Sequence, residues 1–159
     1  MKKLDYLLLN INTIKILGDK IIDIESITNN SEKVLEKSMF VAIKGNNSDG
    51  HNYIDQAILN GAKCIVCQIL PKKIVNSITY IIVKNVRSEY SKICSNFFDN
   101  PSEKLNLIGI TGTNGKTTTA TFLYEILKLQ NIKSGLISTN CIKIQDKKFD
   151  TNLTTPDSY

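Results

Sequence analysis

The run Gly-Ile-Thr-Gly-Thr-Asn-Gly-Lys-Thr-Thr-Thr at residues 109–119 decides how the rest of the chain is interpreted. A near-continuous apolar stretch precedes it at residues 105–110, and apolar residues at helical spacing follow it from 116 to 129. Such a stretch is typical of a strand that a parallel sheet buries on both faces. Glycines in the connection let consecutive backbone N–H groups point inward, and the helix adds its positive N-terminal end. The sequence therefore predicts a phosphate-binding loop between a buried strand and an amphipathic helix.

Two side chains of this loop have a predicted role toward a nucleotide. Lys116 would place its ammonium group against the β- and γ-phosphates, and the Thr117 hydroxyl would bind the Mg²⁺ that accompanies the nucleotide. The glycines fall at 109, 112 and 115, whereas the strict Walker spacing has a glycine where this chain has Ile110. The loop is thus a variant of the common motif.

Outward from the loop, the chain alternates strand-like and helix-like segments. Strands are expected at residues 39–43, 64–68, 78–83, 135–139 and 141–144, and helices at 53–60, 87–98 and 116–129. The polar segment at 99–104 contains Pro101 and separates two such series. We therefore expect an α/β protein with two units: a small N-terminal α/β domain at 1–103, and the start of a parallel-sheet phosphate-loop domain at 104–159.

Composition excludes several classes of protein. The 159 residues are 42% hydrophobic, which is enough for a conventional core without metals or disulfides. The net charge is +5, but the lysines are scattered and Arg87 is the single arginine, so a nucleic-acid surface is not expected. The chain has neither a signal peptide nor an apolar stretch long enough to span a membrane, which favours a cytoplasmic protein.

The cysteines and the single histidine favour structural roles. Cys64 and Cys67 lie in an apolar run that is predicted to be a strand, where positions three apart point to opposite faces, so we expect buried core cysteines and no shared metal or redox site. His51 is expected to fix the turn into the helix that follows it.

Three groups of motifs resemble a known family, the Mur ligases. Residues 111–119 resemble the ATP loop of these enzymes, and residues 38–45 with Asp49-Gly50-His51 resemble their N-terminal uridine-nucleotide domain. Residues 136–139 and 153–157 resemble the members that add the third amino acid to UDP-N-acetylmuramoyl-L-alanyl-D-glutamate in peptidoglycan synthesis. The resemblance implies ATP-driven amide formation through an acyl phosphate, with lysine or meso-diaminopimelate as the added amino acid.

The resemblance also implies functional residues, cofactors and partners. Ser31 matches the uridine-binding serine of the family, and Thr154 and Thr155 would hydrogen-bond the muramoyl-peptide substrate. ATP and Mg²⁺ are the implied cofactors, with Thr117 on the metal and Lys116 as the catalytic residue. A monomer that binds neither nucleic acid nor membrane is expected. The implied ATP-binding residues are Gly112, Thr113, Asn114, Gly115, Lys116, Thr117 and Thr118.

Members of the family are much longer than this chain, so we expect an N-terminal portion of such a ligase that is inactive alone. Three alternatives remain open. The chain could be a non-catalytic product that binds UDP or a nucleotide weakly, a part of the related D-alanyl-D-alanine-adding ligase, or a small phosphate-loop kinase.

Overall fold

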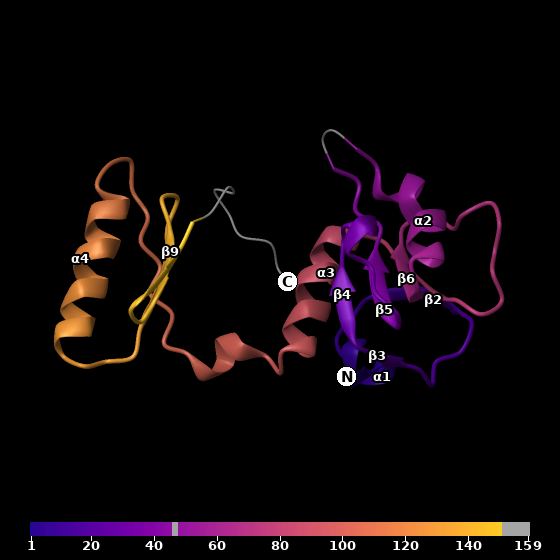
Figure 1. Cartoon of the computed structure of the whole chain (residues 1–159), viewed down its shortest axis with the longest axis horizontal. Coiled ribbons are helices and arrows are strands. Elements are labelled where there is room, and N and C mark those ends of the chain that lie inside the picture. The colour runs from indigo at the N-terminus through magenta and orange to yellow at the C-terminus, as the bar shows by residue number, and fades with distance from the viewer. Residues whose placement is uncertain (46–47, 151–159) are drawn as a thin grey trace. The chain divides into compact units, whose positions relative to one another are not determined.

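The structure is a computed structural model that describes residues 1–45 and 48–150 (Figure 1). The chain forms two compact units, of which the first comprises Met1–Leu105 and the second begins at Asn106. Within the described ranges, no helix combines the length and the apolar character that a membrane span requires.

The first unit is built on a five-stranded sheet with the strand order β2-β7-β6-β5-β4. The pairs β4–β5, β5–β6 and β6–β7 are parallel, whereas the edge strand β2 runs antiparallel to β7. The strands predicted at residues 39–43, 64–68 and 78–83 are confirmed as β5, β6 and β7. The strand bounds are β2 Thr13–Leu17, β4 Ser26–Thr28, β5 Ser38–Val41, β6 Ala62–Cys67 and β7 Thr79–Val83.

Helices cover both faces of this sheet (Figure 1). On one face, α1 (Leu4–Leu7) and α3 (Val86–Phe97) pack on Met39, Val41 and the alternate residues of β6 and β7. On the other face, α2 (Ile54–Leu59) packs on Phe40 and the intervening residues. The helices predicted at 53–60 and 87–98 are therefore confirmed. The remaining elements are β1 Lys2–Lys3, β3 Asp23–Ile24 and the 3₁₀ turns η1 Ser31–Lys33, η2 Gly50–Tyr53 and η3 Pro101–Lys104.

The cysteines of β6 lie on opposite faces of the sheet, as the sequence predicts. Cys64 belongs to the core under α3, and Cys67 belongs to the core under α2. Burial raises the pKa of the Cys64 thiol above its usual range and that of Cys67 to about 11. Both thiols are therefore protonated at neutral pH and behave as apolar core groups.

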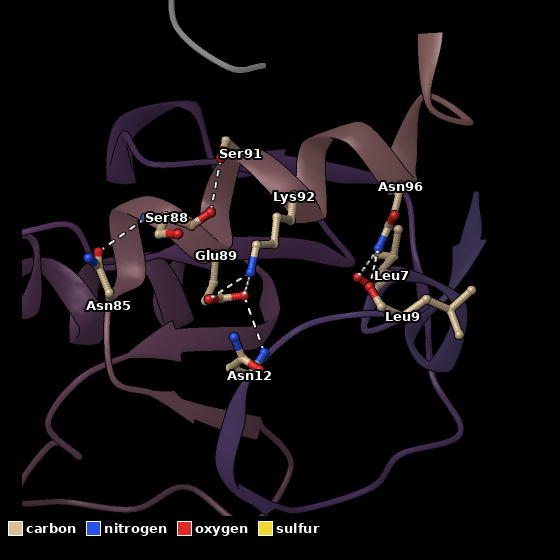
Figure 2. Close-up of polar contacts among 9 residues, drawn as sticks. All are labelled: Leu7, Leu9, Asn12, Asn85, Ser88, Glu89, Ser91, Lys92 and Asn96. Carbon is tan, nitrogen blue, oxygen red and sulfur yellow. Dashed lines mark hydrogen bonds and ion pairs between the residues drawn. The ribbon is translucent and has the colours of Figure 1, made fainter. Parts of the chain in front are cut away.

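Two buried polar side chains of α3 hold the N-terminal segment in place (Figure 2). The Asn96 Nδ2 donates to the carbonyl oxygens of Leu7 and Leu9, at 3.0 and 2.9 Å. The Glu89 carboxylate accepts the backbone N–H of Asn12 at 3.2 Å and forms an ion pair with Lys92. These contacts fix the course of the chain immediately before β2.

We expect Asn96→Ala to lower the free energy of unfolding by about 1–3 kcal/mol, because two carbonyl groups lose their donor. Urea denaturation followed by circular dichroism measures the change. Arg87→Ala is the control, since this side chain is exposed on the same helix. Equal denaturation midpoints for the two variants would contradict the anchoring role of Asn96.

The second unit contains α4 (Lys116–Leu129) and an antiparallel sheet with the order β10-β9-β8. The predicted helix is confirmed, and the strands predicted at 135–139 and 141–144 are confirmed as β8 (Gly135–Ile137) and β9 (Ile142–Ile144). The third strand, β10 (Lys147–Phe149), was not predicted, because three charged or polar residues at 146–148 hide its pattern.

The prediction of a buried strand before the glycine loop is wrong for this structure. Residues 106–110 form no strand, and the side chains of Leu107 and Ile108 are 72% and 64% exposed. A strand needs hydrogen-bonding neighbours, and the described part of the second unit offers none to these residues. In the described part of this unit, β8, β9 and β10 pair antiparallel, although a parallel sheet was expected.

Candidate functional site: the glycine loop and the carboxyl edge of the sheet

The glycine loop leads directly into the first turn of α4. Gly112 has φ 153° and Gly115, the residue before the helix, has φ 76°, so both backbones lie in regions that side chains disfavour. A Cβ at Gly115 would meet no atom within 4 Å, so glycine is favoured there by the backbone conformation and not by a lack of space for a side chain. The loop therefore presents backbone N–H groups at the open N-terminal end of a 14-residue helix, where an anion is favoured.

Lys116 is the cation of this loop. Its Nζ donates to the carbonyl oxygens of Gly112 and Thr113, at 2.6 and 3.1 Å. Because both partners are neutral carbonyl groups, the ammonium keeps its full charge for an anion that approaches the loop. The Lys116 side chain thus folds back onto the glycine loop.

The other predicted loop residues lie around the first turn of α4. Thr113, Asn114 and Thr118 are exposed, and Thr117 is half-buried. Thr117 and Thr118 line a cavity of about 270 Å³ together with Thr121 and Phe122. Thr154 and Thr155 lie outside the described residues.

Ser31 lies at the carboxyl end of β4, in the first unit. It is buried, and its Oγ donates to the Gln56 Oε1 at 3.2 Å. Its carbonyl oxygen accepts a hydrogen bond from the Asn60 Nδ2 at 2.9 Å. Ser31 is thereby fixed by side chains of α2 and of the residue that follows this helix, at the edge of the sheet where α/β proteins commonly bind ligands.

The chain that leaves β5, the strand next to β4, forms a hairpin at the same edge of the sheet. Lys44 and Asp49 pair as an antiparallel bridge, and the Gly45 N–H donates to the Ser48 carbonyl at 2.8 Å. At the base, the Gly50 N–H donates to the Ile43 carbonyl at 2.9 Å. A Cβ at Gly50 would lie 2.7 Å from the backbone nitrogen of Ile43, so only glycine fits there.

The imidazole of His51 connects this hairpin to β6. Its Nδ1 lies 2.7 Å from the Asp49 Oδ1, and its Nε2 lies 3.1 Å from the backbone nitrogen of Gln68. Asp49 also accepts the His51 backbone N–H, and these bonds from His51 lower the pKa of the Asp49 carboxyl. The prediction that His51 fixes the turn into the helix is confirmed, but its link to Gln68 left no signal in the sequence.

A second cavity, of about 390 Å³, lies at this carboxyl edge on the side of β6 and β7. His51 lines it together with the cationic Lys44 and Lys84 and the apolar Ile14 and Val83. In the described ranges, no group of three or more His, Cys, Asp or Glu side chains could hold a metal ion.

Comparison with protein families gives two matches that follow each other along the chain. The family described as "Mur ligase family, catalytic domain" matches residues 23–100. The family described as "Mur ligase middle domain" matches residues 110–159, which include the glycine loop.

The curated relatives are named as ligases. The "UDP-N-acetylmuramoyl-L-alanyl-D-glutamate--2,6-diaminopimelate ligase" of Phocaeicola vulgatus is 41% identical over 155 residues, which are 98% of this chain and 32% of the relative. The enzyme of the same name, numbered 1, from Clostridium acetobutylicum is 46% identical over 143 residues, 90% of this chain and 30% of the relative. The chain thus spans about a third of the length of the curated relatives it matches.

Solved structures of Mur ligases share the fold. A "UDP-N-acetylmuramoyl-L-alanyl-D-glutamate--2, 6-diaminopimelate ligase" matches with a TM-score of 0.66 and 20% identity, covering 91% of this chain and 29% of that one. MurF ligase of Thermotoga maritima, solved in complex with ADP, matches with a TM-score of 0.53 and 31% identity, covering 69% of this chain and 24% of that one. On these matches, the chain belongs to the Mur ligase family.

Proposed function

We propose that this chain supplies the substrate-binding domain and the ATP loop of an ATP-dependent ligase that joins 2,6-diaminopimelate to UDP-N-acetylmuramoyl-L-alanyl-D-glutamate. The observation that carries the proposal is the 41% identity to a ligase of this name along 98% of the chain. Because both proposed nucleotide substrates are intracellular compounds, we expect the reaction in the cytoplasm.

The two halves of the chain have separate roles in this proposal. Residues 1–103 bind the uridine nucleotide, with Ser31 as a ligand at the carboxyl edge of the sheet. Residues 104–159 bind ATP through the seven loop residues from Gly112 to Thr118. Thr154 and Thr155 are proposed to hydrogen-bond the muramoyl peptide. The T. maritima relative, solved in complex with ADP, supports nucleotide binding in this family.

In the proposed reaction, a carboxylate oxygen of the UDP-linked peptide attacks the γ-phosphorus of ATP, and the bond from that phosphorus to the β-γ bridging oxygen breaks. ADP leaves, and the acyl phosphate that forms is attacked by the amine of the incoming amino acid, which loses a proton and displaces inorganic phosphate. Transfer between anions depends on alignment and on neutralised charge, so the protein needs cations and N–H donors more than a nucleophile.

The residues of the loop fit these needs. Lys116 stabilises the charge on the phosphoryl group in transfer, and the N–H groups of the loop align the phosphates. The Thr117 hydroxyl is a hard oxygen ligand of the kind that Mg²⁺ prefers, at the first turn of α4. Bound there, Mg²⁺ would neutralise charge on the β- and γ-phosphates.

A hybrid enzyme tests the proposal, with residues 1–159 replacing the matching segment of the P. vulgatus ligase. We expect ATP hydrolysis that depends on both UDP-N-acetylmuramoyl-L-alanyl-D-glutamate and diaminopimelate, measured as phosphate release, with amide product detected by mass spectrometry. The unaltered ligase is the positive control. A folded hybrid that binds neither ATP nor the UDP substrate would overturn the proposal.

A further inference from the structure

The contacts of His51 fix which of its ring nitrogens carries the proton. The backbone N–H groups of Gln68 and Ile69 point at Nε2, with N···N distances of 3.1 and 3.4 Å. A backbone nitrogen is only a donor, so Nε2 must be the acceptor and therefore has no hydrogen. Nδ1 consequently carries the proton and donates a hydrogen bond to the Asp49 carboxylate, with 2.7 Å between Nδ1 and Oδ1.

This imidazole is one link in a chain of hydrogen bonds that crosses three adjacent strands. Asp49 belongs to the hairpin that follows β5, and Gln68 and Ile69 follow β6. The Gln68 Nε2 donates in turn to the carbonyl oxygen of Lys84, which follows β7, at 2.9 Å. The carboxyl ends of β5, β6 and β7 are thus tied to one another through His51 and Gln68.

The order of the strands relates this chain of hydrogen bonds to Ser31. Since β4, β5 and β6 are parallel neighbours, Ser31, the hairpin and the residues that His51 contacts follow their strands at the same edge of the sheet. In its described arms, the hairpin is closed by the Lys44–Asp49 bridge and by the bonds from Gly45 to Ser48 and from Gly50 to Ile43, and the Ala42 N–H donates to the Val66 carbonyl of β6 at 2.8 Å. Its position relative to Ser31 therefore depends on what supports it from the β6 side.

We propose that His51 is a positioning residue for the uridine-nucleotide site, which acts by holding the arms of the hairpin against the end of β6. The proposal rests on the proposed function, in which Ser31 belongs to that site. The two ring nitrogens of His51 are engaged by Asp49 and by the end of β6, and its side chain lies mostly buried, so the role assigned to it is exerted through the hairpin.

Two substitutions test separately the hydrogen bonds that His51 makes to the end of β6 and the hydrogen bond that it makes to Asp49. In His51→Gln, the Oε1 lies near the position of Nε2 and still accepts the N–H groups of Gln68 and Ile69. In His51→Asn, the amide nitrogen replaces Nδ1 and still donates to Asp49, but no atom reaches the end of β6. Asn52→Ala is the matched control, because Asn52 directly follows His51 and its side chain is exposed.

The experiment measures the affinity of the 159-residue chain for UDP by calorimetry, and amide hydrogen exchange at Gln68 and Ile69 by NMR. We expect His51→Asn to weaken UDP binding about tenfold and to expose both amides to exchange, whereas His51→Gln and Asn52→Ala stay within about twofold of the unaltered chain. A folded His51→Asn chain that binds UDP normally would overturn the positioning role, as would a His51→Gln chain that binds as weakly as His51→Asn.

The two proposals fail in different ways. If the unaltered chain binds no UDP, the proposed function of the first unit fails, and the positioning role fails with it. If the unaltered chain binds UDP and the amides of Gln68 and Ile69 exchange freely, the proposed function stands and the role of His51 alone is overturned.

Discussion

Lys116→Ala in the hybrid enzyme is expected to lower kcat/KM for ATP by a factor of about 10²–10³, the usual effect of removing one charge-stabilising donor from a transition state. Lys116 is the cation at the helix start, and its Nζ already lies 2.6 Å from the Gly112 carbonyl oxygen. The substitution removes both the charge for the phosphates and this bond within the loop. The rate of phosphate release at saturating UDP substrate measures the loss.

The matched control is Lys128→Ala, which removes the same charge from the other end of α4. Lys128 pairs with Asp146 at 2.7 Å, and the two side chains are 49% and 85% exposed, so the pair contributes little to stability. Lys116→Arg adds a second comparison, because it keeps the charge but changes the shape of the donor. An activity loss of equal size for Lys116→Ala and Lys128→Ala would contradict a specific role for Lys116 at the phosphates.

The elements that were predicted well are those whose signal is local. The helix at 116–129 follows from apolar spacing and a glycine immediately before it, and both features lie within one short stretch of sequence. The opposite facing of Cys64 and Cys67 likewise follows from the twofold repeat of a strand.

The failures involve partners that are distant along the chain. Residues 106–110 have the composition of a buried strand, but a strand also depends on neighbours that its own sequence does not specify. In the same way, nothing near His51 indicates Gln68, and nothing near Asn12 indicates Glu89, 77 residues later. The candidate site was therefore predicted as motif residues, whereas the contacts that position Ser31 and the hairpin emerged only from the fold.

Phe40→Ala is expected to be the most destabilising single change in the first unit, at about 3–5 kcal/mol. Phe40 is fully buried in the middle of β5, and it packs in the core under α2 with Ile54, Ala57 and Tyr80. Removing the ring leaves a cavity that two parallel neighbours and a helix cannot easily fill. Equilibrium urea denaturation measures the change in the free energy of unfolding.

Leu59→Ala is the control for this prediction, because its side chain is 86% exposed on α2 and its truncation removes almost no buried surface. A loss for Phe40→Ala no larger than for Leu59→Ala would mean that β5 is not held by its side chains. The result also bears on the proposed function, since β5 leads into the hairpin at the edge of the sheet where Ser31 follows β4. Because a typical domain has a free energy of unfolding of about 5–15 kcal/mol, the expected loss is a large fraction of the total stability of the first unit. We therefore expect UDP binding by Phe40→Ala to disappear at a lower urea concentration than in the unaltered chain, in step with unfolding, whereas His51→Asn weakens binding in a chain that remains folded.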